Sequence, residues 1–349
     1  MAVLLVFLCL SVMVRAQSPY AQLDDWLHAH TKEMGGRSVL VIYSGGKVVY
    51  DHAVNDMTGK QKMVDRYIFK RMKQEGATED YGFTTRQPIA SCSKWLSAAL
   101  VMTFVDEGKL RLTDTVGQFL PVLSAHGKGA ITMGECLSHL TGIQEPPMKQ
   151  ILAEMKDVRS MDQAIALIAD MPMEGEPGKV FHYSNAGLQI AGAVIEKISG
   201  KSFETLFAER IARPLGLTNT DFGKGPVALP AGGAGSTPED YLTFLVMIMN
   251  KGELNGVRVL SEKSVEEMQV NRLGPDVRIA YSPVESGQLG YGYGEWVMDG
   301  AVTSPGLFGS FPIVDNKKKY CAFLLTFYLD NKGRNERYMD LKKLIDEKI

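Results

Sequence analysis

The chain has 349 residues, of which 45% are hydrophobic and 22% are charged, and its formal net charge is -2. This length and composition are typical of a soluble globular protein with one large bilobal unit or two domains. The absence of a basic surplus argues against a nucleic-acid partner.

Residues 1–16 are predicted to be a signal peptide. Ala2–Val14 is a short apolar run, and Val14-Arg15-Ala16 resembles a small-residue cleavage site. The run is too short to favour a membrane span. We therefore expect an exported protein, periplasmic or secreted, without stable membrane association after leader cleavage. Because no Lys or Arg precedes the apolar run, an uncleaved anchor is the alternative.

The next residues predict a helix near Tyr20–Met34 and a hairpin over Ser38–Val54. The turn of this hairpin holds Ser44-Gly45-Gly46-Lys47, whose Ser-x-x-Lys spacing is explained by turn chemistry alone. The charged segment Lys60–Glu79 predicts a solvated loop or surface helix, with a flap over the site as the alternative.

A second Ser-x-x-Lys, Ser91-Cys92-Ser93-Lys94, opens an almost entirely apolar run that ends at Gly108. Such a run predicts a helix that is buried all round. Residues i and i+3 share one helix face, so Ser91 is a candidate nucleophile and Lys94 its base, provided that burial lowers the lysine pKa. A structural serine at the helix start is the alternative.

Tyr183-Ser184-Asn185 precedes a helical pattern that ends at Gly200. A phenol beside a lysine can pass protons, so Tyr183 is a candidate proton carrier. The amide of Asn185 can hold both the lysine and a substrate carbonyl. The alternative is a half-buried aromatic followed by a helix N-cap.

Cysteine and histidine patterns indicate neither a disulfide framework nor a metal site. Cys92, Cys136 and Cys321 are widely spaced and odd in number once the leader is removed. The six histidines show no ligand spacing. We expect no metal and no cofactor; His139 is expected to hold a loop near the site, and His182 to pack there or touch the proton network.

Towards the C-terminus, two helical stretches follow Gly232, and strands are predicted at Tyr291–Met298, Val302–Val314 and Tyr320–Leu329. A last helix is predicted over Arg334–Lys348.

With these motifs in order, the chain resembles the serine β-lactamase-related superfamily: class C β-lactamases, D-alanyl-D-alanine carboxypeptidases, D-aminopeptidases and family VIII esterases. Ser91-Cys92-Ser93-Lys94 and Tyr183-Ser184-Asn185 match its first two motifs. The third motif departs from Lys-Thr-Gly, because the corresponding segment is Ser304-Pro305-Gly306. The resemblance implies substrate-binding roles for Ser304, Gly306 and Leu307, with the N–H groups of Ser91 and Leu307 as an oxyanion hole.

The resemblance also implies a fold that combines α/β and all-α parts, a bilobal arrangement with an antiparallel sheet flanked by helices and an inserted helical lobe. Residues 17–90 and 225–349 would form the α/β lobe. Residues 91–224 would form the helical lobe that carries both motifs.

We expect an exported serine hydrolase that forms an acyl-enzyme on Ser91 and acts on a small ester, amide or peptide. Loss of the third-motif cation favours uncharged esters. The alternatives are a β-lactamase, a D-Ala-D-Ala carboxypeptidase or a D-aminopeptidase, and a catalytically silent binding protein of the same fold.

Substitution of the serine in each Ser-x-x-Lys segment tests which of the two serines is the nucleophile. Ser91→Ala should abolish turnover and covalent labelling by a fluorophosphonate probe, while lowering the free energy of unfolding by only about 1 kcal/mol. Ser44→Ala serves as the control and should leave both readouts unchanged. A fully active Ser91→Ala protein would show that the nucleophile lies elsewhere.

Overall fold

The computed structural model describes residues 19–72, 76–283, 286 and 289–349. The predicted signal peptide lies outside these residues. The helices are α1 (Ala21–His30), α2 (Gly59–Met72), α3 (Ser93–Asp106), α4 (Pro121–Ala125), α5 (Met133–Leu137), α6 (Met148–Glu154), α7 (Met161–Asp170), α8 (Ala186–Ser199), α9 (Phe203–Phe207), α10 (Arg213–Leu215), α11 (Pro238–Met249), α12 (Glu262–Met268) and α13 (Arg334–Lys348). Among the described residues, no helix is long and apolar enough to cross a bilayer.

The strands are β1 (Arg37–Ser44), β2 (Lys47–Asn55), β3 (Gln87–Pro88), β4 (Val180–His182), β5 (Gly235–Ser236), β6 (Glu253–Leu254), β7 (Val257–Arg258), β8 (Arg278–Tyr281), β9 (Gly290–Tyr291), β10 (Trp296–Val297), β11 (Ala301–Thr303), β12 (Phe311–Asp315) and β13 (Tyr320–Thr326). Seven of them form one antiparallel sheet in the order β2-β1-β13-β12-β11-β10-β9. The pairing of β1 with β13, from Ser38 opposite Thr326 to Ser44 opposite Tyr320, joins the two ends of the chain.

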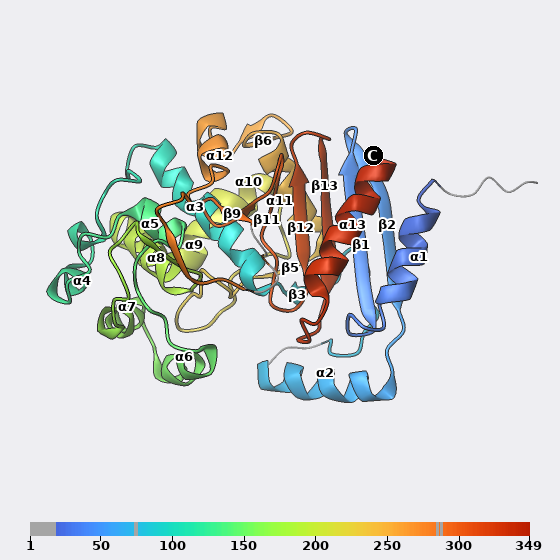
Figure 1. Ribbon diagram of the computed structural model, residues 1–349, viewed down its shortest axis with the longest axis horizontal. Coiled ribbons are helices and arrows are strands. Elements are labelled where there is room, and N and C mark those ends of the chain that lie inside the picture. The colour runs from blue at the N-terminus through green and yellow to red at the C-terminus, as the bar shows by residue number, and fades with distance from the viewer. Residues whose placement is uncertain (1–18, 73–75, 284–285, 287–288) are drawn as a thin grey trace, which may run out of the picture.

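Alternation of side chains along the strands gives the sheet two apolar faces. Leu40 and Ile42 face a core with α1 and α13, whereas Val39 and Val41 face a core with α3 and α11. Figure 1 shows α4, α5, α7 and α8 on the other side of α3 from the sheet. The predicted antiparallel sheet flanked by helices is therefore confirmed, while the lobe boundaries at residues 90 and 224 stay a prediction.

Helix α3 is buried on all sides, as its apolar sequence predicted. Every residue from Ser93 to Phe104 is buried. The helix packs against α8, α9 and α12 in addition to the core beneath the sheet. It therefore occupies the centre of the molecule, and its N-terminal end carries the Ser-x-x-Lys motif.

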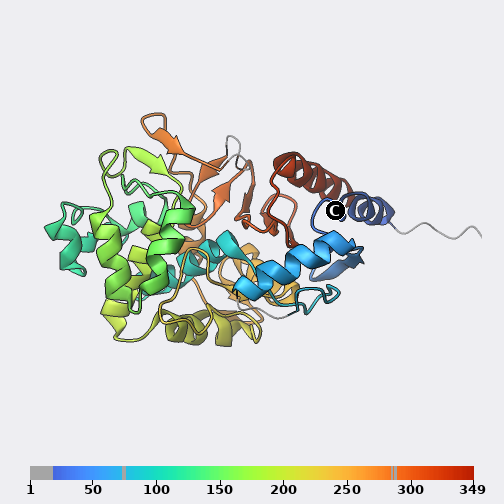
Figure 2. The same cartoon turned by 90° about the horizontal axis from the view of Figure 1, so that it is seen from below.

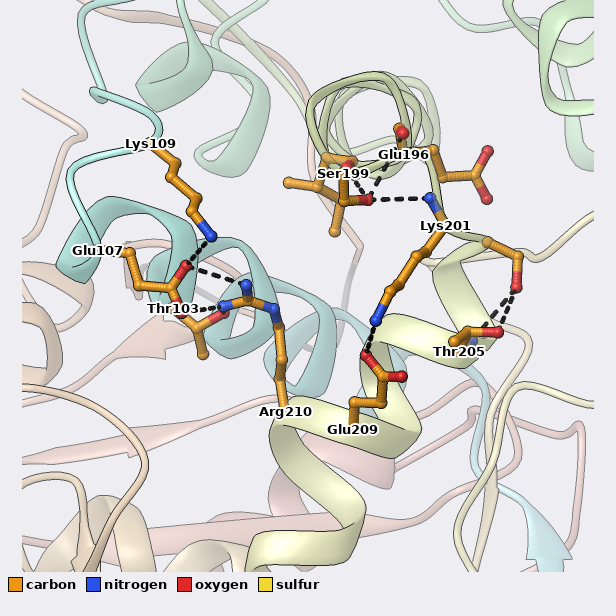
Figure 3. Close-up of polar contacts among 11 residues, drawn as sticks. Thr103, Glu107, Lys109, Glu196, Ser199, Lys201, Thr205, Glu209 and Arg210 are labelled. Carbon is orange, nitrogen blue, oxygen red and sulfur yellow. Dashed lines mark hydrogen bonds and ion pairs between the residues drawn. The ribbon is translucent and has the colours of Figure 1, made fainter.

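The far end of α3 is fixed by Arg210, which lies in a π-helical turn at Ala208–Ala212. Its guanidinium donates two hydrogen bonds to the Glu107 carboxylate, at 2.8 and 2.9 Å, and one to Thr103 Oγ1 at 3.1 Å (Figure 3). The same guanidinium lies 4.1 Å from the centre of the Phe104 ring. Hydrogen bonds from Arg210, and next from Lys109, lower the pKa of Glu107 to about 2.

Two of the predicted C-terminal strands are shorter than expected. The run Tyr291–Met298 forms two strands, β9 and β10, separated by residues 292–295. The run Val302–Val314 likewise divides into β11 and β12. Pro305 has no N–H to donate to a strand, and Gly309 adopts φ +89°, so the chain turns where the sequence pattern suggested continuous extension.

Gly294, in the turn between β9 and β10, lies directly against α3. A Cβ atom at this position would lie 2.6 Å from both Lys94 O and Ala98 Cβ, and φ is +78°. Gly46, in the β1–β2 turn, has a similar φ of +84° but no atom within 4 Å of its Cβ position. The two glycines share a backbone conformation and differ in packing.

Comparison of Gly294→Ala with Gly46→Ala should separate these two effects. We expect Gly46→Ala to lower the free energy of unfolding by about 1–2 kcal/mol, because of its positive φ alone. Gly294→Ala should cost a further ~1–3 kcal/mol through overpacking and should reduce turnover by displacing Lys94. Denaturant titration and ester hydrolysis measure the two quantities. Equal losses of stability would contradict the close packing of Gly294 on α3.

Candidate active site

Ser91 lies in a single 3₁₀ turn, Ala90–Cys92, that leads directly into α3. Ala90 adopts φ +46°, a conformation that is uncommon outside glycine and costs about 1–3 kcal/mol. Such strain clusters at functional sites. The side chain of Ser91 is half-buried, whereas that of Cys92 is fully buried, in agreement with the expected packing role of the cysteine.

A loop at residues 230–234 runs along the first turn of α3. Ser97 Oγ donates to Pro230 O at 2.6 Å, and the N–H of Ala234 donates to Ser93 Oγ at 3.0 Å. The N–H of Ile89 donates to Ala234 O at 3.0 Å. These bonds hold the carbonyl of Ala231 beside Lys94.

The Lys94 ammonium is surrounded by three acceptors. Nζ lies 3.2 Å from Ser91 Oγ and 3.3 Å from Asn185 Oδ1, and it donates to Ala231 O at 2.8 Å. A protonated lysine has three N–H donors and can satisfy all three. When the amine is neutral, two N–H groups can remain on Asn185 and Ala231, and the lone pair can then accept the proton of Ser91.

Burial makes the neutral amine accessible near physiological pH. Lys94 is 1% exposed, and desolvation lowers its pKa to about 8, against an opposing effect of the Glu145 carboxylate. The sequence-based requirement that burial should depress this pKa is therefore met. The 3.2 Å contact and the lowered pKa together allow Lys94 to act as the base for Ser91.

Tyr183 presents its ring to Lys94. The ammonium lies 4.8 Å from the ring centre. The ring stacks on Trp296 of β10, with centres 5.3 Å apart, and lies against the ring of His139 at 4.6 Å. The N–H of Tyr183 donates to Tyr281 O at 3.0 Å. Tyr183 thus belongs to the same site as Ser91 and Lys94, in a fixed aromatic setting.

Asn185 is the N-cap residue of α8, but its side chain makes no capping hydrogen bond. Its Oδ1 accepts from Lys94, and its Nδ2 donates to Glu145 at 3.4 Å. Glu145 takes over the capping role, because its carboxylate accepts the N–H of Asn185 at 2.9 and 3.0 Å. The expected contact between Asn185 and Lys94 is therefore present, and the carboxylate of Glu145 contacts the N–H groups of the same asparagine.

Glu145 contacts the candidate site, and it was not predicted from the sequence. It lies in Glu145-Pro146-Pro147, whose two prolines indicate only a turn, and no spacing links it to a motif forty residues away. Burial raises its pKa, while the N–H of Asn185 and the charge of Lys94 oppose that rise. The carboxylate and the ammonium therefore influence each other within one buried cluster.

The two histidines near Tyr183 have different roles. His139 is 1% exposed, and its pKa is well below the usual value because of burial, with Lys94 as the next cause. Its Nδ1 accepts the N–H of Ser184 at 3.4 Å, so the proton resides on Nε2, 2.9 Å from Tyr291 Oη. His182 instead contacts the Glu174 carboxylate and the ring of Tyr281.

The third-motif segment lies against the turn that carries Ser91. The hydroxyl of Ser304 lies 3.2 Å from Ser91 O and 3.0 Å from Gly294 O, two acceptors for its single proton. A Cβ atom on Gly306 would lie 2.4 Å from Ile89 O, which only glycine accommodates. Ser304, Gly306 and Ser91 are thus brought together, and direct contact of Ser304 with substrate stays a prediction.

Leu307 follows at the surface, 49% exposed. In the described part of the chain, neither its N–H nor that of Ser91 donates to another protein group. Arg334 of α13 fixes the loop from behind, because its guanidinium donates to Leu307 O at 3.0 Å and to Tyr328 O at 3.1 Å. The oxyanion-hole role of the two N–H groups stays a prediction.

No cluster of three or more His, Cys, Asp or Glu side chains suited to a metal ion is found among the described residues.

A family model described as Beta-lactamase matches residues 23–343 of the chain. An uncharacterized protein of Mycobacterium tuberculosis (strain CDC 1551 / Oshkosh) is 28% identical over 237 residues, which are 53% of this chain and 59% of the relative. Penicillin-binding protein 4 of Amycolatopsis lactamdurans is 29% identical over 167 residues, 47% of this chain and 39% of its own length. The chain thus spans less than two thirds of these relatives.

Solved structures agree on the fold. EstCE1, described as a hydrolase with promiscuous acyltransferase activity, superposes with a TM-score of 0.76, covering 94% of this chain and 98% of its own. At 19% identity, this likeness establishes the fold alone. The family model, by contrast, extends over most of the sequence and includes all three motif segments. The chain therefore belongs to the β-lactamase family, whose members are serine hydrolases such as esterases and peptidases.

Proposed function

We propose that this protein is a serine hydrolase that forms an acyl-enzyme on Ser91 and acts on small, uncharged esters. The observation that carries this proposal is the 3.2 Å contact between Ser91 Oγ and the buried amine of Lys94. A hydroxyl beside a lysine with a pKa of about 8 is an activated nucleophile. An intact pair of this kind argues against a catalytically silent binding protein.

In the first step, Ser91 Oγ bonds to the substrate carbonyl carbon as its proton moves to the neutral amine of Lys94. The carbonyl oxygen becomes an oxyanion, which the N–H groups of Ser91 and Leu307 stabilise. The bond to the leaving alcohol then breaks, and the alcohol departs with a proton from Lys94 or Tyr183. Water attacks the acyl-enzyme with the same groups acting in reverse, which regenerates the Ser91 hydroxyl.

The charges around Ser91 support an uncharged substrate. Ser304 has a neutral side chain where the family pattern has a cation. The guanidinium that contacts this segment, that of Arg334, is 2% exposed and donates to three main-chain carbonyls. Glu145 adds a carboxylate next to Lys94. In the part of the chain that the structure describes, the cation that contacts this segment is thus already engaged with main-chain carbonyls, which disfavours the β-lactamase and carboxypeptidase alternatives.

We also propose that the protein is exported, to the periplasm or the medium, after removal of residues 1–16. The apolar run Ala2–Val14 and the small residue at Ala16 support this proposal.

The first test is the pH dependence of catalysis. Because the unprotonated amine of Lys94 is the base, kcat/KM should rise with pH and level off above an apparent pKa near 8. Glu145→Gln keeps an acceptor for Asn185 but removes the negative charge that favours the ammonium. The rising limb should then move to lower pH by roughly one unit.

The exposed Glu154 of α6 provides a matched control, and Glu154→Gln should leave the profile in place. A lower kcat with an unshifted profile in Glu145→Gln would mean that Glu145 only caps α8. A profile without a limb near pH 8 would contradict the assignment of Lys94 as the base.

The second test concerns the substrate. We expect p-nitrophenyl butyrate to be turned over with a higher kcat/KM than nitrocefin or a D-Ala-D-Ala peptide. Ser304→Lys would supply a charge-assisted hydrogen bond and should lower KM for the two carboxylate substrates by about tenfold, with little change for the ester.

Ser304→Met adds similar bulk without charge and should not improve the binding of carboxylates. Efficient nitrocefin or D-Ala-D-Ala hydrolysis by the unmodified protein would overturn the ester preference and leave the Ser91 chemistry intact. Loss of all activity in both variants would indicate instead that the hydroxyl of Ser304 is needed to hold Ser91 O.

A further inference from the structure

Helix α2 combines positive charge and exposed apolar side chains. It carries five basic residues and one acidic residue, Asp65, although the whole chain has a net charge of -2. Asp65 is buried and paired with Arg37 at 2.7 Å, so its charge does not reach the outer face. All five basic side chains are exposed: Lys60, Lys62, Arg66, Lys70 and Arg71.

Met63 and Tyr67 are the two most exposed large hydrophobic side chains in the described part of the chain, at 65% and 61%. They are four residues apart and therefore lie one above the other on the helix. With about 100° per residue, they occupy the centre of the outer face, opposite Asp65 and Phe69. We call this pair, Met63 and Tyr67, the apolar ridge.

The basic side chains flank the apolar ridge on both sides. The same helical geometry places Lys60 and Arg71 along one side. It places Arg66 and Lys70 along the other, whereas Lys62 lies further round the helix, close to the direction of Phe69. An apolar line bordered by two rows of cations is the pattern of a helix that lies in the plane of a membrane interface.

The inner side of α2 is firmly attached, so the apolar ridge cannot turn inward. Phe69 is 2% exposed and contacts the ring of Phe327, with centres 4.8 Å apart. The Arg37–Asp65 pair ties the helix to β1. In Figure 2, which views the molecule from below, α2 lies in front of the other elements, with no described segment drawn over it.

We propose that α2 binds the surface of an anionic phospholipid bilayer, with the apolar ridge in the interface and the flanking cations on lipid phosphates. Each Lys or Arg near such a surface contributes about 1 kcal/mol, and lysine and arginine stems reach past apolar groups to the headgroups. A soluble polyanion would match the cations but would leave Met63 and Tyr67 in water. This association is reversible, so it is compatible with the expectation that the protein has no stable membrane association after leader cleavage.

The N-terminal end of α3 points to the same side of the molecule as α2 (Figure 1). Binding through α2 would therefore turn the end of the molecule that carries Ser91 towards the bilayer.

Vesicle flotation tests the proposal on the full chain. The measured quantity is the ratio of partition coefficients for vesicles of 30% phosphatidylglycerol in phosphatidylcholine and of pure phosphatidylcholine. This ratio cancels any contribution of the uncharged run Ala2–Val14. We expect a ratio well above one that falls as salt increases. Lys60→Gln with Lys70→Gln should lower it by about thirtyfold.

Two exposed lysines on other helices, Lys263 and Lys343, form the matched control, and Lys263→Gln with Lys343→Gln should leave the ratio unchanged. Met63→Ser with Tyr67→Ser should weaken binding to the anionic vesicles severalfold. All variants should hydrolyse a soluble ester at the parental rate, which shows that they are folded.

Equal partitioning of the unmodified protein into both kinds of vesicle would overturn the proposal. Retention on heparin, combined with unchanged vesicle binding after Met63→Ser and Tyr67→Ser, would also overturn it in favour of a soluble polyanion.

Discussion

The buried ammonium of Lys94 is the constraint on which the rest of the site depends. A charge in the interior is tolerated only if hydrogen bonds replace its water shell. The three acceptors come from separate parts of the chain: Ser91 before α3, Asn185 before α8 and Ala231 from the loop along α3. The burial that lowers the pKa of Lys94 therefore also fixes the positions of Ser91, Asn185 and the Ala231 loop relative to one another.

A second layer of contacts supports these three segments. Glu145 caps α8 and so orients Asn185, and Arg210 fixes the far end of α3. Ser304 and Gly306, between β11 and β12, pack directly against the turn that carries Ser91. Hydrogen bonds and close packing thus hold the groups around Ser91, and the carboxylate of Glu145 lies in the same buried cluster as Lys94.

The sequence predicted the residues whose chemistry is local. Ser91 and Lys94 share a helix face, and Asn185 starts a helix. The spacing of these residues in the sequence was therefore enough to predict that they are candidates for the site. It did not reveal Glu145 or the carbonyl of Ala231, because tertiary packing alone brings these groups to Lys94. It also overestimated two strands, since β propensity continues through Gly292–Glu295 and Ser304–Ser310, where glycine and proline turn the backbone.

The pairing of β1 with β13 has a consequence for biosynthesis. β1 is synthesised before the whole helical region and its partner β13 after it. Contacts of such long sequence separation form late and slowly. Leu307, which we propose as a donor of an oxyanion N–H, lies between β11 and β12, the two strands that precede β13. Ser91 is therefore synthesised well before the strand that completes the sheet, and the packing of the sheet on the turn of Ser91 can form only after β13 has been made.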